Sequence, residues 1–474
     1  MAQPKVTFTT KIAYGFGAVA YGVKNNGFDY FLLIFYSQIL GVDASLVGLA
    51  LLIALVFDAF SDPIVGYLSD STPGRLGRRH PWMYAAALPV AFGYYFLWSP
   101  PDSLTGNDLF LYLVVLSIFI RTLITFYEVP SSALAAEISQ DYDERTSLMA
   151  WRSFFGWVAG TLIAVYTLVV ILAPSEANPA GLFNRAGFQT YGLIASNLIL
   201  VSILVASLGT QKLAKPLLAA AETRTKGPAR ILSDIIETLK HKSFFAVFLA
   251  TVLAAIATGL TMSLNLYLNT FFWGLTPDQI SVLILAVLVA SVLSLILAPA
   301  VSKAMGKKRA AILCSSAILF LSPVLISLRL FGLMPENGDP ALFPILVLTA
   351  VVEMTLTITV QILMMSMIAD LVEQNEMRTG RRSEGVFFAT ITFTRKATQG
   401  LGVWAASLVL VFASFPVGAR PDEIPEGSVD MLAQVYLPMI VVLWVLKIVA
   451  INFYRIDRRD HEATLAKLNA VSQT

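Results

Sequence analysis

Long apolar runs recur along the whole chain, and they constrain its fold more than any other feature. A run of about 20 mostly apolar residues can cross the ~30 Å hydrocarbon core of a bilayer. A chain in lipid must satisfy its backbone hydrogen bonds internally, so continuous runs predict helices and not barrel strands. We therefore expect an all-α membrane protein with twelve transmembrane helices, at residues 12–40, 45–69, 82–99, 108–136, 147–173, 187–209, 243–274, 278–300, 309–329, 342–371, 384–414 and 431–454.

The charge content agrees with a membrane protein and excludes several other classes. Only 14% of the 474 residues are charged, whereas soluble proteins carry about 25%. A net charge of +2 gives no indication of a nucleic-acid partner. The sequence has no P-loop, no paired Cys and His ligands and no nucleophile–base pair. We therefore expect no enzyme activity and no cofactor or metal beyond a coupling ion, in a protein that acts as a monomer in the lipid bilayer.

The distribution of Lys and Arg outside the runs predicts the orientation. Short loops rich in Lys and Arg stay in the cytoplasm. Acidic residues such as Asp43 and Asp102 dominate the other side. Both termini are therefore predicted to be cytoplasmic, with the protein in the plasma (inner) membrane. The cytoplasmic set includes Lys5, Lys11, Arg75, Arg78, Arg79, Arg145, Lys303, Lys307, Lys308, Arg309, Arg378, Arg381 and Arg382.

A long hydrophilic segment divides the twelve runs into two groups of six. We predict an N-terminal six-helix bundle at 1–210, a cytoplasmic linker at 211–242 and a C-terminal six-helix bundle with its tail at 243–474. Ile231, Ile235 and Leu239 recur at helical spacing, which predicts an amphipathic helix in the linker, acting as a simple tether or in regulation. A cation-rich glycine turn follows the second run of each group, and such parallel repeats are expected of secondary transporters.

Two carboxylates in the second run are the sharpest functional signal. Asp58 and Asp62 are four residues apart and lie on one helix face. Like charges in lipid need a cation or a proton between them. Ser61 and Thr392 can supply hydroxyl ligands, and Lys396 can supply the counter-charge when no ion is bound. We predict a coupling-ion site for Na+ or H+; the alternative is that Asp62 caps a turn and Asp58 pairs with a lysine.

Further ionisable and amide side chains inside the runs are candidates for substrate binding. Two readings remain open for the cations Arg121 and Lys24. They bind an anionic substrate, such as a uronide, or they form structural ion pairs, Arg121 with Glu128 or Glu353 and Lys24 with Asp29. The candidates for substrate binding are Gly22, Lys24, Asn25, Asn26, Asp29, Arg121, Glu128 and Arg152.

Several motifs resemble one transporter family over nearly the whole chain. The loop Gly74-Arg-Leu-Gly-Arg-Arg79 is similar to the signature loop of the major facilitator superfamily. The segments at 9–18, 57–66, 77–82 and 127–130 and the Lys396 segment resemble the glycoside–pentoside–hexuronide:cation symporters, of which melibiose permeases are typical. The animal sodium-dependent lysolipid transporters are relatives. The resemblance implies the major facilitator fold.

The resemblance also implies roles for individual residues. Asp58 and Asp62 would bind the coupling cation, with Thr392 as a further ligand and Lys396 nearby. Glu128 and Arg152 would belong to the network that couples sugar and cation. In melibiose permeases an Asp replaces Gly22 and a Trp replaces Ser132, which argues against a galactoside as substrate.

The resulting functional prediction is a cation-coupled secondary active symporter that works by alternating access. Its substrate would be a sugar or glycoside, and the candidates include an anionic one such as a uronide. The alternatives are a transporter of lysolipids or other amphiphiles and, in another class, a membrane receptor or sensor without turnover. Ion pairs across the bundles are expected to close the cytoplasmic side, formed by Arg75, Arg78, Arg79, Asp141, Arg145, Arg378, Arg381 and Arg382.

Overall fold

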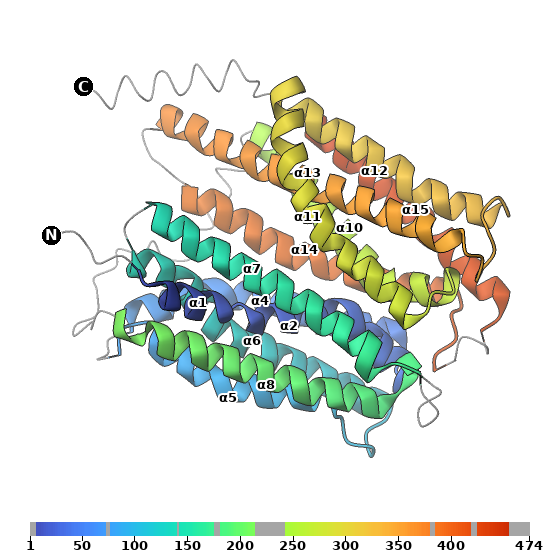
Figure 1. The fold of residues 1–474 in the computed structure, drawn as a ribbon, viewed down its shortest axis with the longest axis horizontal. Coiled ribbons are helices and arrows are strands. Elements are labelled where there is room, and N and C mark those ends of the chain that lie inside the picture. Colours follow the sequence, from blue (N-terminus) through green and yellow to red (C-terminus); the bar gives the residue numbers. More distant parts are fainter. Residues whose placement is uncertain are drawn as a thin grey trace.

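The fold consists of long helices, and the part of the chain that the structure describes contains no strand. This computed structural model describes residues 6–72, 76–139, 142–174, 181–213, 242–379, 384–418 and 424–454. In Figure 1, helices α1 to α8 gather in the lower part of the molecule and α10, α11, α12, α13 and α15 in the upper part, with α14 between them. This arrangement supports the division into two bundles, which stays a prediction.

Each predicted span coincides with helix in the structure. The first span is broken into α1 (Phe8–Phe16), α2 (Val19–Asn26), η1 (Gly27–Phe31), α3 (Leu32–Ile34) and η2 (Phe35–Ile39). The remaining spans match α4 (Ala44–Ser71), α5 (His80–Trp98), α6 (Asn107–Ile138), α7 (Tyr142–Tyr166) with η3 (Thr167–Ile171), α8 (Arg185–Thr210), α10 (Lys242–Tyr267) with η6 (Leu268–Phe272), α11 (Pro277–Met305), α12 (Lys307–Leu330), α13 (Leu342–Thr379), α14 (Glu384–Phe412) and α15 (Glu426–Asn452).

Length and composition let most of these helices cross a bilayer. Among the described residues, nine helices are long and apolar enough to span a membrane. The spans expected at 12–40, 82–99 and 384–414 are helical too, but they are not among those nine. Most of the predicted linker, with its amphipathic helix, lies outside the described residues.

Matching corners end the first helix of each group. Both η2 and η6 are π-helical turns, and each is followed by a glycine with positive φ, Gly41 at 74° and Gly274 at 61°. The next helix then begins at a side-chain cap, from Asp43 for α4 and from Thr276 for α11. A positive φ is easily adopted only by glycine. The same corner therefore occurs at corresponding positions of the two groups, in addition to the predicted repeat of loops.

Close helix contacts at glycine set the positions of the helices around the centre. A Cβ atom added to Gly22 of α2 would lie 2.1 Å from the Gly156 backbone oxygen of α7. A Cβ added to Gly259 of α10 would lie 2.2 Å from the Gln399 backbone oxygen of α14. Between the groups, α4 packs against α14. This last contact brings the two predicted coupling carboxylates on α4 next to Lys396 on α14.

Candidate functional site

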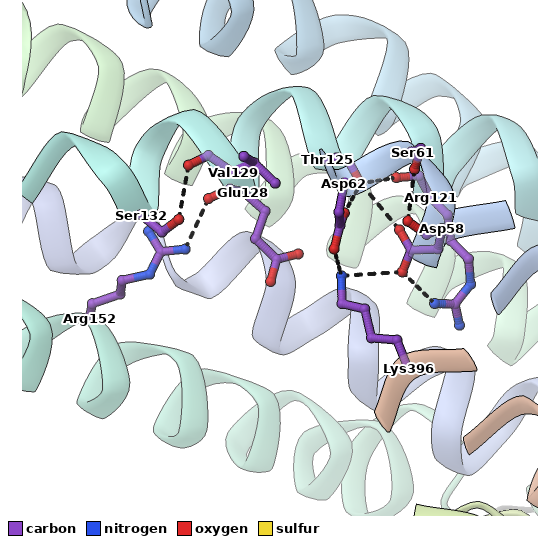
Figure 2. Close-up of polar contacts among 10 residues, drawn as sticks. All are labelled: Asp58, Ser61, Asp62, Arg121, Thr125, Glu128, Val129, Ser132, Arg152 and Lys396. Carbon is purple, nitrogen blue, oxygen red and sulfur yellow. Dashed lines mark hydrogen bonds and ion pairs between the residues drawn. The ribbon is translucent and has the colours of Figure 1, made fainter. Parts of the chain in front are cut away.

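A lysine from the second group of helices lies between the two carboxylates of α4. The Lys396 Nζ atom is 2.5 Å from Asp62 Oδ2 and 3.4 Å from Asp58 Oδ2. Figure 2 shows the three side chains converging from α4 and α14. The structure thus brings together Asp58, Asp62 and Lys396, as the sequence predicted, although Lys396 is 334 residues from Asp62 in the chain.

Helix α6 completes this cluster with a cation and a hydroxyl. Arg121 Nη1 lies 3.4 Å from Asp58 Oδ2. The Thr125 hydroxyl is 3.2 Å from Asp58 Oδ1, 3.0 Å from Asp62 Oδ1 and 2.9 Å from the Arg121 backbone oxygen. A hydroxyl carries one hydrogen, so it can donate to one of these three oxygens at a time. Thr125 therefore links the two carboxylates and can respond to the charge on either. We name Asp58, Asp62, Arg121, Thr125 and Lys396 the carboxylate cluster.

Two positive charges balance two negative charges within this cluster. The side chain of Asp58 is 3% exposed and that of Arg121 6%, whereas Asp62 and Lys396 are 22% and 19% exposed. An unpaired charge at such depth would cost several kcal/mol. The Arg121 guanidinium also lies 4.6 Å from the centroid of the Phe28 ring. The Asp58–Arg121 pair is thus the buried part of the cluster, and Asp62 and Lys396 form the accessible part.

A cavity of about 440 Å³ adjoins the cluster, a volume within the usual range of small-molecule sites. Several lining residues of the first group of helices have a counterpart in the second group, always the same number of residues later in the chain. The charged member comes from the first group in the pairs Lys24 and Ala257, Asp29 and Met262, Arg121 and Met354, and Glu128 and Gln361. At these positions the first group forms a charged wall and the second group a neutral wall, although Glu353, Arg395 and Lys396 of the second group also line the cavity.

The charged wall contains groups that other protein side chains leave available. In the described part of the chain, the side chains of Lys24, Asp29 and Glu128 have no recorded hydrogen bond or ion pair. Figure 2 shows the Glu128 carboxylate between Arg152 and Lys396. Arg152 donates to the Ser131 hydroxyl at 2.8 Å and to the Glu128 backbone oxygen at 3.4 Å. Two carboxylates and one ammonium can thus bind hydroxyl or charged groups of a ligand.

The contacts of Arg121 and Lys24 bear on the two readings left open by the sequence. Arg121 does form an ion pair, but with Asp58 and not with Glu128 or Glu353 in the recorded contacts. The expected pair of Lys24 with Asp29 is not recorded among the described residues. Glu353 lines the cavity. Lys24 is therefore the better candidate for contact with an anionic group.

The other predicted ligands make no recorded contact with the carboxylate groups of the cluster, within the described residues. The Ser61 hydroxyl donates to the Asp58 backbone oxygen at 3.0 Å, within its own helix. The Thr392 side chain lies outside the described residues. Gly22, Asn25 and Asn26 line the cavity, and the Asn26 amide donates to the Gly22 backbone oxygen at 3.1 Å.

The predicted cytoplasmic gate is described only in part. Arg78 pairs with Glu137 at 2.7 Å, and Arg79 contacts the same carboxylate, so both contacts stay within the first group of helices. A similar pair joins Lys307 to Asp370 at 2.6 Å in the second group. The remaining predicted gate side chains lie outside the described residues: Arg75, Asp141, Arg145, Arg378, Arg381 and Arg382.

Two residues that the sequence analysis did not select stand out in the structure. Thr125 lies four residues after Arg121, on the same face of α6, and this spacing could have identified it. Lys447 is an ionisable residue inside the last predicted span, and it is only 4% exposed. Its position inside a predicted membrane span is the signal that could have identified it.

The double contact of Thr125 leads to a testable prediction. Thr125→Val removes a hydrogen bond to charged groups, which contributes roughly 1.5 kcal/mol. We therefore expect the cation concentration for half-maximal uptake to rise about tenfold. Thr122→Val on the same helix is the matched control, because the buried Thr122 hydroxyl has no hydrogen-bond partner among the described residues. Equal cation dependence of the two variants in proteoliposomes would exclude a role for Thr125.

Known proteins that are similar to this chain in sequence are transporters. The sequence profile of a family described as MFS/sugar transport protein matches residues 13–458. An uncharacterised symporter of Synechocystis is 27% identical, with 100% of this chain and 98% of that protein covered. The sodium-dependent lysophosphatidylcholine symporter 1 of Gallus gallus is 23% identical, with 100% and 92% covered.

The fold has solved counterparts as well. A bacterial homologue of the human drug peptide transporters PepT1 and PepT2 superposes with a TM-score of 0.64 at 14% identity, with 98% of this chain and 99% of that one covered. At this identity the likeness concerns the fold alone, which is that of the major facilitator superfamily.

Proposed function

Since the chain belongs to the MFS/sugar transport protein family, and is thus a membrane transporter of the symporter type, we propose that it carries a sugar or glycoside together with Na+ or H+. The observation that carries the proposal is the position of Lys396 between Asp58 and Asp62, beside a cavity lined with hydrogen-bonding groups. Asp58, Asp62 and Thr125 provide oxygen atoms for a coupling cation, with Ser61 and Thr392 as further candidates.

The coupling follows from competition between two positive charges. A cation bound at Asp58 and Asp62 repels the Lys396 ammonium, which lies on the helix of the other group. Because Lys396 also lines the cavity, its displacement changes the charge that a substrate meets there. Binding of cation and substrate is then cooperative by linkage. Rocking of the two groups of helices would expose this common site to each side in turn.

The charged wall of the cavity favours a ligand with many hydroxyl groups. Asp29 and Glu128 accept hydrogen bonds from hydroxyls, and Lys24, Asn25 and Asn26 can donate them. Lys24 is also the group that we propose for the carboxylate of an anionic glycoside such as a uronide.

A second candidate substrate is a lysolipid. The neutral wall contains Met262, Ile284, Val287, Met354 and Ile358, which could contact an acyl chain. One relative at 23% identity is a lysophosphatidylcholine symporter. In this case Lys24 would contact the phosphate of the headgroup.

Uptake into proteoliposomes tests the proposal. The compounds are methyl α-D-glucoside, methyl β-D-xyloside, methyl β-D-galactoside, methyl β-D-glucuronide and lysophosphatidylcholine, with Na+ and proton gradients imposed separately. We expect gradient-driven accumulation of at least one glycoside. Accumulation of lysophosphatidylcholine alone would favour the second candidate. Binding of a glycoside without accumulation under either gradient would point to a receptor and contradict the symporter.

A further inference from the structure

A buried lysine that the coupling scheme does not use, Lys447, contacts Trp444, a residue that lines the cavity. Lys447 of α15 is 4% exposed, and its Nζ atom lies 4.0 Å from the centroid of the Trp444 ring. No hydrogen bond or ion pair is recorded for Lys447 within the described part of the chain. An ammonium in the membrane interior is costly and is rarely kept without a role.

The direction of the Lys447 side chain explains the contact. Side chains on a helix lean toward its N-terminal end, so a lysine reaches the residue three positions earlier on the same side. The ammonium therefore covers one face of the Trp444 indole, in the geometry of a cation–π interaction. Arg121 and Arg152 also lie over aromatic rings, but each of them has a polar partner in addition. For Lys447 the indole is the principal recorded partner.

Trp444 itself lies at the cavity. Its side chain lines the cavity together with Ile440, one turn earlier on α15, and it is half-buried. It packs against both apolar clusters of the protein. Because Trp444 is among the residues that line the cavity, a ligand bound there can contact its side chain.

We propose that Trp444 is the platform on which the sugar ring of the substrate stacks, and that Lys447 is a positioning residue that holds the indole at the cavity wall. This inference rests on the proposed function, because it names the substrate part as a sugar ring. A pyranose has a rim of hydroxyls and a face of C–H bonds. The groups at Lys24, Asp29 and Glu128 match the rim, and an aromatic face matches the C–H bonds. An acyl chain would not need a fixed aromatic ring.

The platform is tested with the panel glycoside that the unmutated protein accumulates most. Trp444→Leu is expected to raise the KM for this glycoside about tenfold and to change kcat less than about twofold. This pattern is expected of a group that binds the substrate equally in the ground state and in the transition state. An unchanged KM in Trp444→Leu would overturn the platform. If the unmutated protein accumulates no panel glycoside, the proposed function fails, and the sugar platform with it.

The positioning role of Lys447 has its own readouts. Lys447→Met is expected to raise KM about fourfold, and Lys447→Arg to restore it within about twofold, because a guanidinium also binds aromatic faces. Lys303→Met, at an exposed lysine of the same group of helices, is the matched control. Tryptophan emission provides a measurement without sugar: Lys447→Met should shift it, and the shift should disappear in the Trp444→Phe background. An unchanged KM together with no Trp444-dependent shift would overturn this role.

Discussion

Asp58→Asn is expected to reduce uphill accumulation of substrate by about 100-fold or more. Breaking a buried charge pair by removing one partner costs ~3–5 kcal/mol, and the same change removes a charged ligand of the coupling cation. A loss of ~3 kcal/mol in cation binding corresponds to more than 100-fold in affinity. Gradient-driven uptake into proteoliposomes measures this loss. Binding of substrate without a gradient should weaken, because it is cooperative with cation binding, but it should remain detectable, because Asp29, Glu128 and Lys24 are unchanged.

Two further variants separate loss of coupling from loss of folding. Ser69→Ala is the matched control on α4, since the Ser69 hydroxyl donates to the Gly66 backbone oxygen of its own helix at 3.0 Å; we expect uptake close to that of the unmutated protein. Asp58→Asn leaves the Arg121 cation without its recorded partner. The double variant Asp58→Asn with Arg121→Gln restores the charge balance. It should therefore recover the yield of folded protein but not the accumulation of substrate. Undiminished accumulation in Asp58→Asn would refute the assignment of the cation site.

Gly22→Asp is expected to prevent folding, although it introduces the residue that melibiose permeases carry at this position. The added Cβ would lie 2.1 Å from the Gly156 backbone oxygen, and backbone atoms cannot move aside as a flexible side chain can. Overpacking in a well-packed interior costs ~1–3 kcal/mol or more, and here α2 and α7 would have to separate. The yield of monodisperse protein and its thermal midpoint in detergent measure the effect. Gly22→Ala should show a milder loss of the same kind.

A second glycine provides the comparison for this prediction. A Cβ added to Gly66 of α4 would lie 3.5 Å from Val129 Cγ1, which is an ordinary contact. Gly66→Ala should therefore leave yield and thermal midpoint unchanged or slightly raised. If Gly22→Asp were as stable as Gly66→Ala, the close contact of α2 with α7 would not be a requirement of the fold.

The sequence predicted the helices well because hydropathy reports directly on the solvent around them. It also brought Asp58, Asp62 and Lys396 together, since intramembrane charges must find partners and few were present. The sequence suggested Glu128 or Glu353 as the ion-pair partner of Arg121 and missed Asp58, because only the rotation of α6 decides which carboxylate the guanidinium reaches. Thr125 escaped notice because hydroxyls are common in membrane helices. Close packing at Gly22 depends on the distance between two helices, which no pattern in one sequence encodes.

The matching corners after η2 and η6 bear on the ancestry of the chain. A π-helical turn, a left-handed glycine and a capped helix start at equivalent places are what duplication and fusion of one six-helix unit would produce. The charges did not remain equal afterwards. Where one copy has Arg121 and Glu128, the other has Met354 and Gln361. The two halves of the chain thus share one corner geometry but differ in charge at corresponding positions of the cavity.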